Sequence, residues 1–102
     1  MSSYNISFAY KGDVKRVVIS GSIIINHIEK IYDELKSNIS TDKDVEIEVV
    51  ADNVDITFVQ LMLSMKLAWK ESGKNLQLNI SIPEDLEVLL AKAGINLEEI
   101  RQ

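Results

Sequence analysis

VEIEVVADNVDITFVQL, residues 45–61, runs directly from a strand pattern into a helix pattern. Its first part, residues 45–51, begins by alternating apolar and acidic residues and ends continuously apolar, which is typical of a central strand. Its last residues open an apolar helix, expected over about residues 58–71, so apolar that we expect burial on more than one side. A strand followed closely by a helix predicts an α/β domain.

The patterns on either side of this stretch complete the expected fold. Two alternating segments around the turn Lys11-Gly12-Asp13 predict a hairpin, and helix and strand patterns alternate after it. The expected elements cover residues 4–10, 14–20, about 26–37, 45–51, about 58–71, 76–82 and 83–93. Their order, ββαβαβα, predicts one α/β domain over residues 1–102, with a four-stranded, mostly parallel sheet and three main helices.

Some boundaries of these elements can be predicted from single residues. Gly21 is expected to end the second strand, and Gly94 the third helix. Leu89 is expected on the inner face of that third helix. Beyond it, the apolar residues Ile95, Leu97 and Ile100 are expected to form a last turn or a docking tail.

Two helix starts carry the pattern of a capping box, in which the first side chain bonds to an amide three residues on. Asn26 and the glutamate three positions later predict one box, and Thr57 with Gln60 predicts the other. In the second box, Ile56 would precede the cap and pack back onto the helix as a hydrophobic staple. This interpretation gives Asp55 no role beyond a favourable position near the positive end of the helix.

The charge and the cysteine content exclude several classes of function. The formal net charge of −5 disfavours binding to nucleic acid or to anionic lipid. The chain has no cysteine, so neither disulfides nor thiolate metal sites can form, which fits the cytoplasm. The first residues lack the pattern of a signal peptide, and the apolar runs are too short for direct membrane insertion.

The residues that usually carry catalysis are sparse. His27 is the only histidine, and we interpret it as a solvent-exposed helix residue rather than a ligand or a base. The four glycines are isolated and form no phosphate-binding loop. We therefore expect no metal site, no cofactor and no enzymatic activity.

Five landmarks, taken in order, resemble those of the STAS domain, the fold of bacterial anti-sigma-factor antagonists. They are Ile19-Ser20-Gly21, the strand 45–51, Asp55 with the helix behind it, Gly73-Lys74 and Ala93-Gly94-Ile95. The segment 55–66 is especially similar to the stand-alone STAS proteins found in chemotaxis and in lipid transport. The landmarks span nearly the full chain.

The resemblance implies a regulatory role for the start of the second helix. In this family a Ser or Thr directly after the aspartate is phosphorylated by a partner kinase, and that position is Ile56 here. Phe58 replaces a small residue of the family pattern. Thr57 lies one position late, and we keep two hypotheses for it, a phosphate acceptor or only a helix cap.

The resemblance further implies a protein partner that binds at this helix start and the neighbouring strand end. The expected contact residues are Ser20, Ser22, Ile23, Asp55, Ile56, Thr57 and Phe58. The expected partner is an anti-sigma factor of the serine-kinase type or a chemotaxis signalling protein. A transporter ATPase in lipid trafficking is the alternative partner, and a nucleotide or small-ligand sensor is a third interpretation. The apolar faces would also allow a homodimer.

Overall fold

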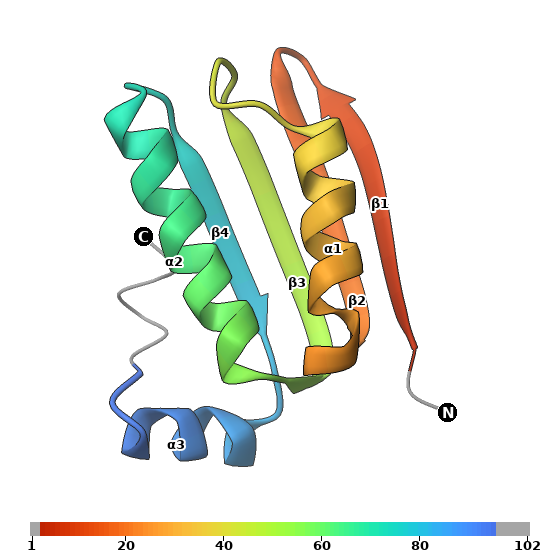
Figure 1. Cartoon of the computed structure of the whole chain (residues 1–102), viewed down its shortest axis with the longest axis vertical. Coiled ribbons are helices and arrows are strands. Elements are labelled where there is room, and N and C mark those ends of the chain that lie inside the picture. The colour runs from red at the N-terminus through yellow and green to blue at the C-terminus, as the bar shows by residue number, and fades with distance from the viewer. Residues whose placement is uncertain (1–2, 96–102) are drawn as a thin grey trace.

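The computed structural model describes residues 3–95 and confirms the predicted order ββαβαβα (Figure 1). Each strand or helix extends at most three residues beyond its expected bounds at either end, or falls one residue short of them. The elements are β1 Tyr4–Lys11, β2 Val14–Ile23, α1 Ile25–Asn38, β3 Val45–Val54, α2 Ile56–Glu71, β4 Leu76–Ser81 and α3 Glu84–Lys92.

The four strands form one sheet in the order β1-β2-β3-β4. β1 and β2 pair antiparallel as the predicted hairpin, whereas β2, β3 and β4 are parallel. Both crossovers step across the sheet in the same direction, so a common right-handed sense places α1 and α2 on the same face. Figure 1 shows both helices in front of the sheet, and α3 below the lower end of α2 on the β4 side. The topology is compatible with that of a STAS domain.

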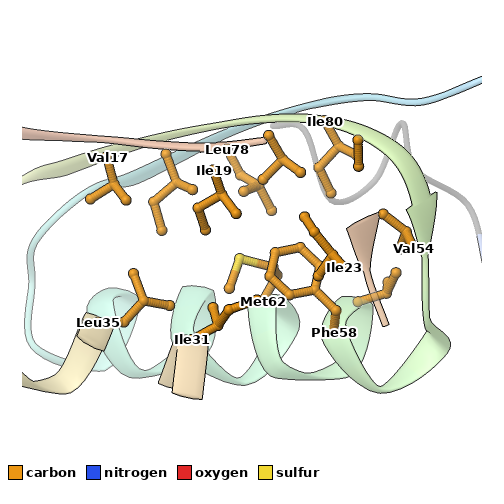
Figure 2. Close-up of a cluster of buried hydrophobic side chains, with 14 of the residues drawn as sticks. Val17, Ile19, Ile23, Ile31, Leu35, Val54, Phe58, Met62, Leu78 and Ile80 are labelled. Carbon is orange, nitrogen blue, oxygen red and sulfur yellow. The ribbon is translucent and has the colours of Figure 1, made fainter. Parts of the chain in front are cut away.

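The core fills the space between the sheet and its two covering helices (Figure 2). Alternate residues of the strands point into it, and β4 follows this alternation along its whole length. Helix α1 adds Ile31 and Leu35 from one face, and α2 adds Phe58 and Met62. Each of these four side chains is at most 1% exposed, so they are central to the packing.

The opposite face of the sheet has no helix over it within residues 3–95. Arg16 on β2 bridges two carboxylates of β3 there, with N–O distances of 3.3 Å to Glu46 and 2.6 Å to Glu48. Val50 belongs to the same face and is 49% exposed. The expectation that β3 is a central strand is confirmed, because it pairs with β2 on one side and β4 on the other, although its residues alternate between a buried and an open face.

The sequence predicted that Gly21 ends β2. In the structure Gly21 lies within β2, at a break in its register with β3. Its φ of +99° is a conformation that side chains rarely adopt. A Cβ atom there would lie 2.5 Å from the carbonyl oxygen of Ser3, so the chain before β1 can approach this closely only because the residue is glycine.

Trp69 connects the far end of α2 to the segment between α1 and β3. Its indole N–H donates to the carbonyl oxygen of Lys43 at 2.9 Å, and the side chain is 5% exposed. This bond satisfies the polar atom of a ring that otherwise belongs to the core.

Some apolar residues expected inside are at the surface. Leu63 and Leu67 on α2 are 45% and 57% exposed, and Leu89 on α3 is 62% exposed. The sheet thus covers one side of α2. The expectation that α2 is buried on further sides is wrong for Leu63 and Leu67. Ile95 packs against the core, whereas Leu97 and Ile100 lie outside the described residues. No helix within residues 3–95 is long and apolar enough to cross a membrane.

Candidate functional site

The two strand-to-helix junctions, β2–α1 and β3–α2, lie side by side at one edge of the sheet (Figure 1). Ile23 at the end of β2 pairs with Val54 at the end of β3. One residue later, the amide of Asp55 donates to the carbonyl oxygen of Ile23 at 2.8 Å. This edge holds the carboxyl ends of the parallel strands, where open α/β sheets commonly bind their ligands.

Asp55 is the N-cap of α2. Its Oδ1 accepts hydrogen bonds from the backbone amide of Thr57 at 2.8 Å and from the Thr57 hydroxyl at 2.7 Å. The amide bond is the main reason that the pKa of Asp55 is lowered, and the hydroxyl bond adds to it, because both bonds favour the ionised carboxylate. Asp55 therefore caps α2, a role that the sequence did not predict for it.

The predicted capping box of Thr57 and Gln60 is wrong, because β3 continues to Val54 and α2 begins at Ile56. Thr57 is consequently the second residue of the helix, and its hydroxyl donates to the cap instead of acting as one. A phosphate on this oxygen would have no proton to donate, and its negative charge would lie next to the Asp55 carboxylate. Modification of Thr57 would thus remove part of the cap of α2.

Two of the expected contact residues are buried. Phe58 and Ile23 are both 0% exposed and point into the core (Figure 2). The early start of α2 turns Phe58 toward the sheet, so the expected surface contact through Phe58 is corrected, as is the contact through Ile23. Ile56, in contrast, is the first residue of α2 and is 41% exposed, so it does not act as a buried staple.

Ile25 is a surface residue that the sequence prediction missed. It is the first residue of α1, as Ile56 is of α2, and it is 62% exposed. Ile25 comes two residues after Ile23, and Ile56 comes two residues after Val54, the strand partner of Ile23. The two isoleucines therefore occupy equivalent places in neighbouring junctions. The repeated strand–helix transition at 23–25 and 54–56 is the signal that could have identified Ile25.

His27 belongs to a small cluster at the start of α1. Its Nδ1 lies 3.0 Å from the carbonyl oxygen of Ser22, and its ring packs against Tyr4 with centroids 5.0 Å apart. The Tyr4 hydroxyl donates to Glu34 at 3.1 Å, and the pKa of Tyr4 is raised mainly by burial and further by this bond. His27 is half-buried, which corrects the expectation of an exposed histidine.

The start of α1 has no side-chain cap. The residue that flanks it is Ile24, so the capping box predicted at Asn26 is wrong. Ser22 is half-buried in the junction, where its carbonyl is engaged by His27. Ser20 lies earlier on β2 and lines a separate shallow hollow of about 360 Å³ with Tyr4 and Gly21. The structure thus brings Ser22 and Ile23 to the Asp55 junction, whereas Ser20 belongs to a neighbouring hollow.

Within residues 3–95, no group of three His, Asp or Glu side chains is placed so that it could hold a metal ion. The sequence matches no model of a known protein family, and no curated protein is significantly similar to it.

Proposed function

We propose that this chain is a non-enzymatic, cytoplasmic protein-interaction module of the STAS type, which binds a signalling partner at its paired junctions. The observation that carries the proposal is the pair of exposed isoleucines, Ile25 and Ile56, at the starts of two neighbouring helices. Apolar side chains exposed together are typical of a contact surface, whereas single exposed apolar side chains are common on any protein.

The groups around the two isoleucines supply the polar rim that protein contacts usually have. Asp55 and Thr57 lie next to Ile56 and are held in one geometry by their mutual hydrogen bonds. Such fixed groups lose little conformational freedom when a partner binds. By the resemblance, the partner is a kinase-like anti-sigma factor or a chemotaxis signalling protein.

Binding at this surface is constitutive in our proposal. Ile56 occupies the position at which STAS proteins of the phosphorylated type carry a hydroxyl. The remaining hydroxyl, on Thr57, is engaged with Asp55. Intact-mass analysis after incubation with the cognate kinase tests this: we expect no added phosphate, and an adduct on wild type that is absent from Thr57→Ala would instead establish a switch.

The contact surface itself is tested with Ile25→Asp and Ile56→Asp, singly and together, in quantitative pull-downs of the partner. Aspartate is favourable at the first position of a helix, so these changes alter the surface without weakening the helices. Leu63→Asp is the matched control, because Leu63 is similarly exposed but lies in the middle of α2.

We expect the double variant to lose the partner and Leu63→Asp to retain it. Equal recovery by all variants would contradict the proposed surface. If wild type instead recovers a transporter ATPase and the double variant does not, the proposed contact surface would stand. The partner would then be the ATPase rather than a signalling protein.

A further inference from the structure

The outer edge of β1 is an unusually open template for another strand. β1 is the first strand of the sheet order, and no strand of residues 3–95 pairs with its outer side. From Tyr4 to Tyr10 it contains no charged residue and no proline, and its pairing with β2 is continuous. Natural edge strands usually carry charges, prolines or bulges that prevent further pairing, whereas β1 carries its only charge at its last position, Lys11.

The backbone groups that face outward can be identified from one hydrogen bond. The amide of Ser22 donates to the carbonyl oxygen of Ser3, which lies directly opposite it, at 2.8 Å. In an antiparallel pair, residues alternate between bonding to the neighbouring strand and pointing away from it. Odd-numbered residues of β1 therefore bond to β2, and the outward N–H and C=O groups belong to Tyr4, Ile6, Phe8 and Tyr10.

We propose that a second copy of this chain pairs antiparallel with β1 about a two-fold axis at Ser7. In this register Tyr4 faces Tyr10 of the second copy and Ile6 faces its Phe8, so all four outward residues of both strands are paired. Shifting the axis by one residue in either direction leaves one outward residue of each strand without a partner. Full pairing thus selects the axis at Ser7.

The charges near the two ends of β1 match this register. The Tyr4 end carries an acidic group, since the Tyr4 hydroxyl donates to Glu34. The Tyr10 end carries two basic groups, with the Nζ atoms of Lys15 and Lys43 at 4.3 Å and 5.6 Å from the centre of the Tyr10 ring. Because the two-fold axis brings each Tyr4 end to the other copy's Tyr10 end, opposite charges meet at both ends of the pairing. Tyr10 is 61% exposed in the single chain and would gain contacts there.

The helices leave room for this arrangement. Figure 1 shows α1 in front of β2, with β1 beyond it at the side of the sheet. In the dimer the two β2 strands would be separated by three strand spacings, about 14 Å. Packed helices need only about 8–10 Å between their axes, so the two α1 helices can lie beside each other on the same face.

The dimer would carry two contact edges that face opposite directions, because the two-fold axis reverses the strands. This bivalency rests on the proposed function at the junctions, whereas the pairing of β1 does not. The experiment below therefore measures self-association alone, and its failure would leave the proposed contact surface untouched.

Sedimentation analysis over a range of protein concentrations tests the pairing. Ser7 is exposed on the open face of the sheet, and in the dimer it would lie directly opposite its own copy. We expect wild type to dimerise, and Ser7→Lys and Ser7→Glu each to weaken dimerisation by about fivefold or more, because like charges then face each other. An equimolar mixture of the two variants should restore the dimer through opposite charges.

Asn79→Lys and Asn79→Glu are the matched controls, since Asn79 is exposed on the same face but on β4 at the other edge. They should leave the dimer unchanged. A wild type that stays monomeric at every concentration, or a dimer that the Ser7 variants leave intact, would overturn the proposal.

A second measurement covers the case in which a Ser7 variant fails to fold. In wild type, the outward amides of Ile6 and Phe8 should exchange with solvent more slowly as the protein concentration rises. Exchange at these two amides that does not depend on concentration would overturn the pairing as well.

Discussion

The two strand-to-helix junctions have the same topology but use different chemistry. At β3–α2, the Asp55 carboxylate accepts the backbone amide of Thr57 in the first turn of the helix. At β2–α1, the flanking residue is Ile24, no side chain caps the helix, and the first turn contains no acidic residue. There, β2 instead contains the Gly21 irregularity, and His27 in the first turn of α1 packs against Tyr4. A covering helix can thus be started by a cap or by tertiary contacts, and only the capped junction carries a charge at its turning point.

Gly21 should give the largest effect, because the uncapped junction depends on its backbone. Gly21→Ala combines an unfavourable φ of +99° with a Cβ atom 2.5 Å from the Ser3 carbonyl oxygen, so we expect a loss of about 3 kcal/mol in the free energy of unfolding. Gly12→Ala is the matched control, with a φ of +65° and no atom within 4 Å of the added Cβ, and should cost about 1 kcal/mol. Equal losses in chemical denaturation would show that the close approach to Ser3 is unimportant.

Removing the cap of α2 should have the next largest effect. Asp55→Ala leaves the Thr57 amide without its acceptor, and we expect a loss of about 0.5–2 kcal/mol in the free energy of unfolding. Asp55→Asn keeps an acceptor oxygen and should lose clearly less at neutral pH. Denaturant titration of the three proteins measures the difference, and an Asn variant as unstable as the Ala variant would mean that the charge, rather than the cap geometry, dominates.

The charge at this junction predicts a pH dependence that Asp55→Asn should lack. The pKa of Asp55 is lower in the folded protein than in the unfolded chain, so the unfolded chain binds the proton more readily. The stabilisation is complete above the ordinary carboxyl range and is lost as the pH falls through the lowered pKa. We expect the stability advantage of wild type over Asp55→Asn to shrink on acidification, and a constant difference would contradict this.

The smallest effect is expected from giving the uncapped junction a charge of its own. Asn26 is exposed in the first turn of α1, and Asn26→Asp should stabilise the protein by about 0.3–1 kcal/mol through the positive end of the helix. The gain should disappear at high salt. Ser37→Asp, at the opposite end of α1, is the matched control and should be neutral or destabilising.

The order and type of the elements could be predicted from the sequence because each has a clear period. β4 alternates along its whole length and α1 repeats its apolar residues at helical spacing. The element ends could not be predicted in this way. β2 and β3 extend each other by pairing Ile23 with Val54, a contact between residues far apart in the chain, and this extension moved both helix starts and overrode both capping boxes.

The same displacement explains what the sequence could and could not predict about the candidate site. Ile56 and Asp55 lie at the junction as expected. The family resemblance predicts Phe58 at the surface, but whether a helical residue is exposed depends on where the helix begins. With the start at Ile56, Phe58 faces the sheet, and the exposed apolar surface moves to Ile25 and Ile56.

Trp69 gives this protein an internal fluorescence reporter. It is the only tryptophan, it is buried, and its indole N–H is bonded to Lys43. Figure 1 places the end of α2 that carries it opposite the end that begins at the junctions. Emission should therefore shift to longer wavelength when the chain unfolds, yet stay nearly unchanged when a partner binds at the junctions. One optical signal can thus distinguish loss of the fold from occupation of its contact edge.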